Sequence, residues 1–298
     1  MPSQDKPISG MMALMTSRIF RDDLLEGSVA IVTGGGSGIG SAIARELGKL
    51  GADVVIASRK AERIQAAAAG LSDELGRPVL GVPCDIRNRD DVDRLMDASI
   101  ERFGRVDVLV NNGGGQFFSP AQFITPNGWD AVVATNLTGT WNLTQSVANR
   151  WMLENGGGKI INVTMNTLRG FPGMAHSCAA RSGVEGMTKT LAVEWAFANI
   201  QVNCIQPGVI ASSGLRNYPD AETMVRQAQE QIPAKRLGTV DEIAWTAAFL
   251  ASRAGNYITG QTLTIDGGRE LWGETWPIPN PEPMPEWEIP IEPWEEQS

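Results

Sequence analysis

The chain has 298 residues, of which 42% are hydrophobic and 20% are charged, and its formal net charge is −9. This is an ordinary globular composition, and no apolar run approaches the roughly 20 residues that a membrane span needs, so no membrane contact is expected. Without a surplus of Lys and Arg we expect no nucleic-acid partner, and the single histidine excludes a multi-histidine metal site.

The chain begins with a segment, residues 1–20, that we expect to form a loose arm. From residue 28 onwards, short apolar runs alternate with helical patterns. The runs expected as strands are residues 29–34, 53–59, 78–85, 106–112, 158–166, 200–208 and 261–268. The helical patterns cover residues 41–51, 61–76, 90–104, 129–155 and 179–198. This alternation predicts an α/β fold: a single Rossmann-type, doubly wound domain over residues 21–270 with a seven-stranded parallel sheet.

The last segment, residues 271–298, differs in composition from the rest. It contains seven of the 17 prolines and four of the nine tryptophans, which are Trp272, Trp276, Trp287 and Trp294. Proline at this density excludes a helix or a central strand. Eight glutamates and no cation follow Arg269, so most of the negative charge lies here. The tail is either a flexible acidic extension or an extended arm whose tryptophans pack on its own domain or a neighbouring subunit.

Targeting signals are the next feature. The N-terminal residues lack the apolar core and cleavage site of a signal peptide, and the final EEQS matches no C-terminal address. Cys84, Cys178 and Cys204 show no paired spacing, which favours buried thiols in a reducing compartment. The prediction is therefore a cytoplasmic protein.

The stretch TGGGSGIG, from Thr33 to Gly40, directly follows the first expected strand and opens a helix. Glycines at this point let the chain turn and let a pyrophosphate approach the free N–H groups of the helix start. Gly34, Gly38 and Gly40 carry the spacing of a dinucleotide fingerprint. The alternative is a glycine-rich turn without a ligand.

The end of the second expected strand bears on the choice between NAD and NADP. It reads Ala57-Ser58-Arg59-Lys60 and lacks the carboxylate that would bind a ribose 2′-hydroxyl. Arg59 can instead hold a 2′-phosphate through two hydrogen bonds. We predict NADP(H), the alternative being that Arg59 and Lys60 are only a solvated helix start.

Further motifs in the same order are similar to those of the short-chain dehydrogenase/reductase family, over about residues 26–269. They are Asp85 in CDI, NNGG from Asn111 to Gly114, Asn136 in NLTG, and QPG from Gln206 to Gly208. The resemblance implies that helices 129–155 and 179–198 pair subunits into a homodimer or homotetramer. With the glycine loop it implies these cofactor contacts: Thr33, Gly34, Ser37, Gly38, Ile39, Gly40, Ser58, Arg59, Lys60, Cys84, Asp85, Ile86, Asn112, Gly113, Gly114, Arg181, Pro207, Gly208 and Ile210.

A narrower resemblance lies in VVIASRKAERI, NNGGGQFFSP, TNLTGTW, HSCAARSGV and IPAKRLG. These stretches are similar to the peroxisomal trans-2-enoyl-CoA reductase branch of the family, near its 2,4-dienoyl-CoA reductases. The resemblance implies a role in fatty acid metabolism, the NADPH-dependent reduction of the 2,3 double bond of an acyl thioester.

The family's catalytic positions are exchanged in this chain. Counting back from Leu191-Ala192 places the family lysine on Arg181 and the family tyrosine, four residues earlier, on Ser177. That spacing keeps both side chains on one helix face. The family serine falls on Thr164 or Met165 depending on the direction of counting, and we choose Thr164 for its hydroxyl. The resemblance also makes Asn136 a catalytic residue.

The exchange separates possible reactions. A ketone needs a proton on its oxygen, and a serine hydroxyl is too weak an acid to supply it. An enoyl thioester mainly needs donors that hold a developing oxyanion, which Ser177, Arg181 and Thr164 can provide. His176 could give the final proton or could only cap and pack, and Tyr218 is another candidate donor. The alternatives are an NADP(H)-dependent alcohol dehydrogenase or carbonyl reductase with a non-tyrosine donor, and a non-catalytic NADP(H)-binding protein.

Overall fold

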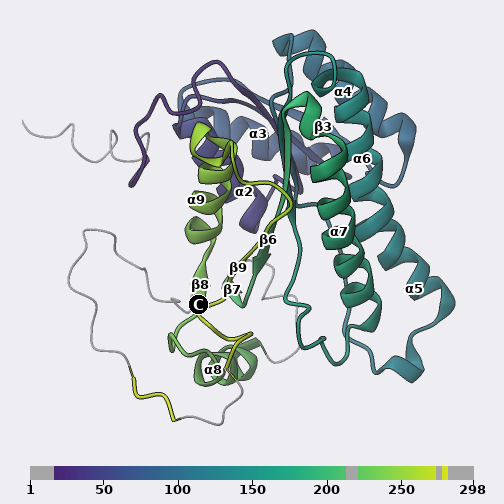
Figure 1. Ribbon diagram of the computed structural model, residues 1–298, viewed down its shortest axis with the longest axis vertical. Helices are drawn as coiled ribbons and strands as arrows, with labels where there is room; N and C mark the ends of the chain where they lie inside the picture. Colours follow the sequence, from purple (N-terminus) through teal and green to yellow (C-terminus); the bar gives the residue numbers. More distant parts are fainter. Residues whose placement is uncertain (1–16, 213–220, 273–276, 281–298) are drawn as a thin grey trace, which may run out of the picture.

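The structure, a computed structural model, describes residues 17–212, 221–272 and 277–280, and its elements surround one parallel sheet (Figure 1). Most of the expected N-terminal arm lies outside these ranges, as do Tyr218, Trp276, Trp287 and Trp294. The described part of the arm does not stand alone, because Phe20 packs against a core cluster.

The central sheet has seven strands, all parallel, in the order β3-β2-β1-β4-β5-β6-β9. This confirms the predicted doubly wound α/β fold. Every expected apolar run became a strand. The strands are β1 (Val29–Thr33), β2 (Asp53–Ser58), β3 (Val79–Pro83), β4 (Val108–Asn111), β5 (Gly158–Val163), β6 (Ile200–Pro207) and β9 (Thr262–Ile265).

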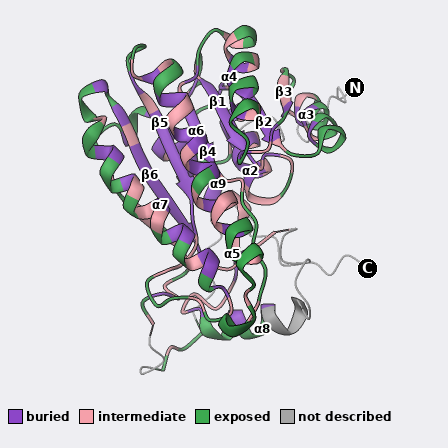
Figure 2. Cartoon of the chain, turned by 90° about the vertical axis from the view of Figure 1, so that its right-hand side faces the viewer, coloured by how far each residue is buried: buried purple, intermediate pink, exposed green. Residues whose placement is uncertain are grey.

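Helices cover both faces of the sheet. One face carries α2 (Gly38–Lys49), α3 (Ala61–Leu75) and α9 (Val240–Ala251). The other carries α4 (Arg89–Phe103), α6 (Gly139–Val147) and α7 (Ala175–Glu194), with α5 (Pro126–Val133) leading into α6. In Figure 2 the buried residues run through the strands and inner helix faces, while exposed residues lie outside.

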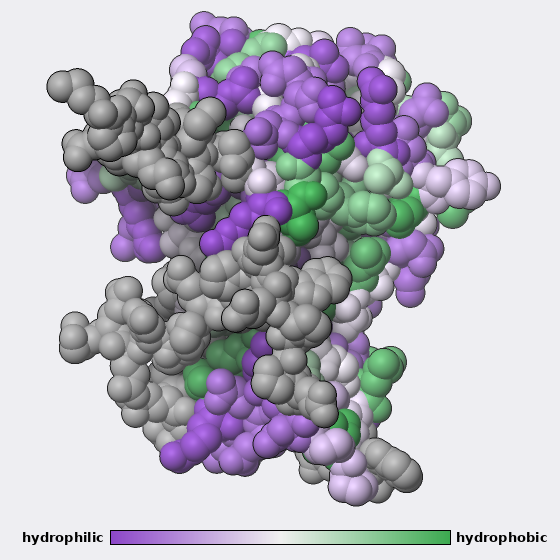
Figure 3. Space-filling view, turned by 90° about the vertical axis from the view of Figure 1, so that its left-hand side faces the viewer, coloured by the Kyte–Doolittle hydropathy of each residue, from purple (hydrophilic) through white to green (hydrophobic). Residues whose placement is uncertain are grey.

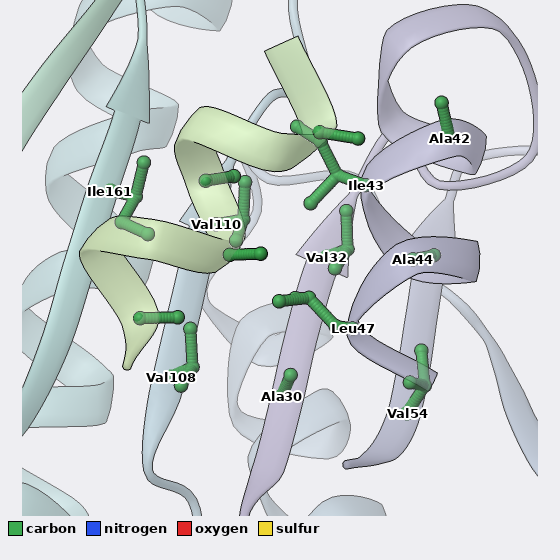
Figure 4. Packing of buried hydrophobic residues seen from close by; sticks show 14 of the residues in the cluster. Ala30, Val32, Ala42, Ile43, Ala44, Leu47, Val54, Val108, Val110 and Ile161 are labelled. Carbon is green, nitrogen blue, oxygen red and sulfur yellow. The ribbon is translucent and has the colours of Figure 1, made fainter. Parts of the chain in front are cut away.

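The inner strands β1, β2, β4, β5 and β6 are buried on both sides, which explains why the sequence shows continuous apolar runs rather than alternation there. The edge strands β3 and β9 are only partly buried. In β1, Ala30 and Val32 belong to the cluster beneath α2 and α9, and Val29 and Ile31 to the cluster beneath α4 and α6. Figure 4 shows side chains of α2, among them Leu47, directed toward β1. A sheet sandwiched in this way holds its loops at fixed relative positions.

The expected helix over residues 129–155 is shifted toward the N-terminus and less regular than predicted. It starts at Pro126, capped by the Thr125 side chain, and two π turns interrupt it at Ala134–Thr138 and Ala148–Met152, where it ends. A π turn inserts one extra residue into the helix, and neither turn was predicted from the sequence. The first of these turns carries Asn136.

The elements that the structure describes between β6 and β9 were not predicted. Among them are the short pair β7 (Ile210–Ala211) and β8 (Gly238–Thr239), α8 (Ala221–Gln231), and α9. Helix α9 packs on α2, and its start is a capping box of Thr239 and Glu242. Helix α8 lies beyond the end of the sheet, with its own small apolar cluster (Figure 1).

The surface is mixed in character. On the face shown in Figure 3, hydrophobic side chains gather in the middle between hydrophilic areas above and below. Among the described residues, no helix is both long enough and apolar enough to cross a membrane.

Leu143 tests the packing of α6 on the sheet, because its side chain is fully buried. Leu143→Ala is expected to lower the free energy of unfolding by about 2–5 kcal/mol, since it leaves a cavity. Leu168→Ala is the control, because Leu168 is 71% exposed. Denaturant unfolding of both variants measures the difference, and an equal loss in the two would contradict this packing.

Candidate active site

The glycine loop forms a cradle between β1 and α2. Gly34 adopts a left-handed backbone (φ +65°), and a Cβ added at Gly40 would lie 2.3 Å from the Gly34 carbonyl oxygen. The N-cap residue Ser37 makes no side-chain capping bond to the start of α2. The N–H groups of that first turn have no intrahelical partner and are available to an anion. These features fit a bound pyrophosphate.

Hydrogen bonds lock this cradle to the loop after β4. Thr33 Oγ1 accepts from the backbone N–H groups of Asn112 (3.1 Å) and Gly113 (2.9 Å). The Asn112 side-chain amide donates in return to the Thr33 carbonyl oxygen at 3.1 Å. The two predicted cofactor segments are therefore held together by the protein itself.

Cations stand where β2 ends. Ser58 is the last residue of β2, and Arg59 and Lys60 are exposed beside it. A hollow of about 610 Å³ opens here, and its lining includes Arg59, Cys84 and Asp85. The Arg87 guanidinium hydrogen-bonds Asp85 and lowers its carboxyl pKa, and the charge of Arg59 adds to this effect. This end of the cleft therefore holds exposed positive charge.

Cys84 and Ile86, two further residues predicted to contact the cofactor, are buried. Burial raises the pKa of the Cys84 thiol to about 12, helped by the charge of Asp91, so it stays protonated. Ile86 packs so tightly on α6 that a Cβ at Gly139 would lie 2.6 Å from its Cγ1.

The remaining predicted cofactor residues lie at the end of β6. Pro207 ends β6, the Gly208 N–H donates to the Ile265 carbonyl oxygen at 2.9 Å, and Ile210 is buried in β7. The predicted cofactor residues therefore follow the carboxyl ends of the parallel strands along the chain, except Arg181, which lies on α7 and reaches Gly114 in the loop after β4.

Asn136 organises the loop after β4. Its Oδ1 accepts from the Gly115 N–H at 3.0 Å, and its Nδ2 donates to the Gly115 carbonyl oxygen at 2.9 Å. The fully buried side chain is thus occupied on both sides by one residue's backbone. Its direct effect is to fix the backbone next to Gln116.

Gln116 contacts Ser177, which is buried in the first turn of α7. The Ser177 hydroxyl donates to Gln116 Oε1 at 2.9 Å and lies 3.4 Å from Met165 Sδ. This contact holds the Ser177 side chain against the loop that follows β4.

Arg181 lies one turn further along α7 and is buried without a carboxylate partner among the described residues. Its Nη1 donates to the Val163 carbonyl oxygen at 3.0 Å, and this is its one hydrogen bond within residues 17–212, 221–272 and 277–280. Burial lowers the pKa of its guanidinium to about 10, which leaves it charged at neutral pH. A guanidinium has five N–H donors, so this one keeps donors for a ligand.

Gly114 provides the space that the guanidinium occupies. A Cβ added there would lie 2.1 Å from Arg181 Nη2 and 2.8 Å from Asn136 Oδ1. The loop glycine, the asparagine and the arginine therefore share one crowded point.

Thr164 and Met165 point in different directions at the end of β5. The Thr164 hydroxyl donates to the Ile205 carbonyl oxygen at 3.3 Å, toward β6. The side chain that contacts Ser177 is that of Met165. The catalytic role expected for Thr164 stays a prediction, and Met165 occupies the position beside Ser177.

His176 is fully buried beside Ser177. Its Nδ1 accepts from the Ser177 backbone N–H at 2.8 Å, and its ring meets Phe117 edge-on with centroids 4.4 Å apart. Nε2 has no hydrogen-bond partner among the described residues. The Nδ1 atom thus satisfies one N–H of the first turn of α7, and the proton-donating role considered for His176 stays a prediction. The other candidate donor, Tyr218, lies outside the described residues.

Sequence reasoning missed Gln116 and Met165 as parts of this site. Gln116 is the first polar residue after the glycines that follow β4, and Met165 is the residue reached by counting forward along β5 from Asn162. Both signals are positional, and residue type alone does not mark either side chain as functional.

Comparison with known proteins gives consistent matches over nearly the whole described chain. The family model described as enoyl-(acyl carrier protein) reductase matches residues 34–270. The chain is 38% identical over 259 residues to a peroxisomal 2,4-dienoyl-CoA reductase [(3E)-enoyl-CoA-producing] of Danio rerio, covering 86% of this chain and 85% of the relative.

Two further matches are bacterial. A probable 2,4-dienoyl-CoA reductase [(2E)-enoyl-CoA-producing] of Bacillus subtilis (strain 168) is 36% identical over 250 residues, which are 83% of this chain and 98% of the relative. The solved structure of a citronellol catabolism dehydrogenase of Pseudomonas aeruginosa PAO1 superposes with a TM-score of 0.76 at 40% identity. The match covers 85% of this chain and 98% of that structure's chain.

The crowding at Gly114 gives a testable expectation. Gly114→Ala should lower turnover on the order of 100-fold, because the new Cβ displaces Arg181 or Asn136 from a site where small shifts matter. Steady-state kinetics with saturating dinucleotide measures the loss.

Gly115→Ala is the matched control, since a Cβ there meets nothing within 4 Å and its bonds to Asn136 are made by backbone atoms. It should retain most of the activity. Adding Arg181→Lys to Gly114→Ala should restore part of the loss, because lysine lacks the Nη2 group. Equal losses at Gly115 and Gly114 would refute the crowding argument.

Proposed function

The chain belongs to the short-chain dehydrogenase/reductase family and is an oxidoreductase, and on that premise we propose that it uses NADP(H) to reduce the 2,3 double bond of an enoyl thioester. The observation that carries the proposal is the buried, under-satisfied Arg181 beside Ser177, in a site that lacks the family's tyrosine. The family relationship implies a nicotinamide cofactor, and the glycine cradle fits its pyrophosphate.

The site is poorly suited to carbonyl reduction. A ketone oxygen needs a proton as it gains negative charge, and neither a serine hydroxyl nor an arginine gives one up readily at neutral pH. The imidazole of His176 lies beside Ser177, but its Nδ1 already accepts from the Ser177 backbone N–H. These contacts favour a reaction without strong proton donation to oxygen.

Reduction of an enoyl thioester matches the donors that are present. A bound nicotinamide cofactor supplies the hydride that adds to the β-carbon of the acyl chain. The thioester oxygen then carries the enolate charge, which Arg181 can stabilise through its remaining N–H donors and Ser177 can stabilise once its hydroxyl turns away from Gln116. Fixed donors of this kind are a large source of catalysis in a site that excludes water. The α-carbon then takes a proton from solvent, which needs no acidic side chain.

Asn136 and Gly114 support this arrangement without touching the substrate in our proposal. Asn136 holds Gly115 through two hydrogen bonds, and the next residue is Gln116. Gly114 leaves room for the guanidinium. Arg181 can also hold the nicotinamide ribose through its spare N–H groups.

The preference for NADP(H) rests on Arg59. Its exposed guanidinium stands beside the end of β2, where a carboxylate would select NAD. Lys60 adds a second cation, and Ser58 adds a hydroxyl. These groups can surround a 2′-phosphate, with Arg59 as the strongest planar donor.

The relatives sharpen the choice of substrate. Two of them are named for 2,4-dienoyl-CoA, which is also a conjugated thioester, so a dienoyl-CoA is the second candidate substrate. The solved relative named as a dehydrogenase keeps an alcohol or carbonyl substrate as the alternative class. The family relationship supports an enzyme over a non-catalytic NADP(H)-binding protein.

We also propose that the protein forms a homodimer or homotetramer. Val193 and Phe197, at and just beyond the end of α7, are 79% and 80% exposed, as apolar side chains of a subunit contact would be in a single chain. The cytoplasmic location expected from the sequence stays a prediction.

A substrate panel tests the proposed reaction. Oxidation of NADPH should proceed with trans-2-enoyl-CoA or 2,4-dienoyl-CoA and should not proceed with ketones of matched chain length. Arg181→Met should abolish that oxidation, because it removes the charge that faces the enolate. Rapid turnover of the ketones, with none of either thioester, would overturn the proposal.

Arg59 tests the cofactor choice. Arg59→Ala is expected to raise the KM for NADPH at least about tenfold while changing the KM for NADH little, because the lost charge-assisted bonds go to the 2′-phosphate. Arg63→Ala is the control, since Arg63 is an exposed cation one turn along α3. An equal effect on both cofactors would contradict the assignment.

A further inference from the structure

Residues 266–272, which follow β9, run between two segments that are distant from each other in the sequence; we call residues 266–272 the C-terminal strap. One segment is the loop of residues 164–174 between β5 and α7. The other is the end of α8 and the residues after it, 231–235. No family motif noted in the sequence includes Trp272.

The strap is tied to the β5–α7 loop at several points. Asn166 Nδ2 donates to Asp266 at 3.0 Å, and the Leu168 N–H donates to Glu270 at 2.7 Å. Arg169 then grips the end of the strap, donating to the carbonyl oxygens of Trp272 at 2.6 Å and Leu271 at 3.0 Å. These bonds hold the loop in register with the strap.

That loop leads directly to the candidate site. Its residue Met165 contacts the Ser177 hydroxyl, and its backbone at Met165 is held by the Gln206 amide at 2.7 Å. A shift of the loop would therefore change the surroundings of Ser177.

The strap also meets the end of α8. The Ala234 N–H donates to the Gly267 carbonyl oxygen at 3.2 Å, and a Cβ at Gly267 would lie 2.7 Å from Ile232. At the far end of the strap, Lys235 Nζ lies 4.8 Å from the centre of the Trp272 ring, a cation–π contact.

Lys235 is held in an unusual backbone conformation at this contact. Its φ is +56°, a left-handed value that costs a non-glycine residue about 1–2 kcal/mol. Its side chain also donates to the Glu230 carbonyl oxygen at 2.9 Å. The surrounding contacts, of which the Trp272 ring is one, must offset this cost.

The α8 segment packs on few other described residues, among them Val209 and Ala211. Its buried residues form a small cluster of their own, distinct from the two large clusters that pack the sheet. Segments with few buried apolar contacts open locally at low free-energy cost. The strap is therefore well placed to set how often this segment moves.

We infer that Trp272 is a latch, fastened by Arg169 on one side and Lys235 on the other, which ties α8 to the loop beside Ser177 and so sets how well the acyl substrate is held. Opening the latch releases α8 and the loop of residues 164–174 from each other. It leaves the cofactor cradle, which lies over β1 and β4, unchanged. The kinetic part of this inference rests on the proposed function.

Hydrogen exchange tests the latch without any substrate. Trp272→Ala and Lys235→Met should each make amides of residues 225–235 exchange roughly fivefold faster, as expected for a cation–π contact of about 1 kcal/mol. Lys235→Arg should retain the slow exchange, because arginine also lies over an aromatic ring. Leu271→Ala is the matched control, since the Leu271 side chain is 81% exposed in the same strap.

Kinetics then tests the consequence. The same two variants should raise the KM for the acyl thioester roughly fivefold, with the KM for NADPH unchanged, and thermal unfolding should show that each remains folded. Exchange that is unaltered in both variants, or accelerated equally by Leu271→Ala, would overturn the latch. Faster exchange in a protein that turns over no thioester would instead contradict only the proposed function.

Discussion

Parallel pairing of the seven strands is the constraint on which the rest of this structure depends. Because every strand points the same way, the loops that follow β1, β4, β5 and β6 meet at one edge. Hydrogen bonds between these loops make the edge rigid, as when Thr33 binds the backbone of Asn112 and Gly113. The sheet can therefore hold the proposed cofactor cradle, between β1 and α2, and the start of α7 in fixed positions relative to each other.

The chemistry proposed for the site depends on the buried positive charge of Arg181. Arg181 is buried at the price of desolvation, and Val163 satisfies one of its donors. The absence of a side chain at Gly114 is what makes room for this large cation. An environment that strengthens electrostatic interactions favours stabilising a substrate anion, whereas a serine in place of tyrosine disfavours protonating one.

The proposed cofactor side of the site and the α8 segment are stabilised by different interactions. The cofactor side rests on the sheet and on two large apolar clusters. The α8 side rests on a small cluster and on polar contacts with the C-terminal strap, among them the Lys235–Trp272 pair. Polar contacts at a surface are individually weak, so the second side is the natural place for movement.

The sequence by itself determined the succession of strands and helices along the chain and the glycine loop after the first strand. It also determined the cations after β2 and the positions of Ser177 and Arg181, because each of these depends on local pattern or spacing. Only the tertiary structure decided that Met165 rather than Thr164 contacts Ser177. It also decided that Gln116 accepts from Ser177 and that the Trp272 ring lies beside Lys235. Those facts depend on where strand ends and loops meet in space. Periodicity determines which face of an element is buried, but contacts between distant loops arise only when the sheet brings them together.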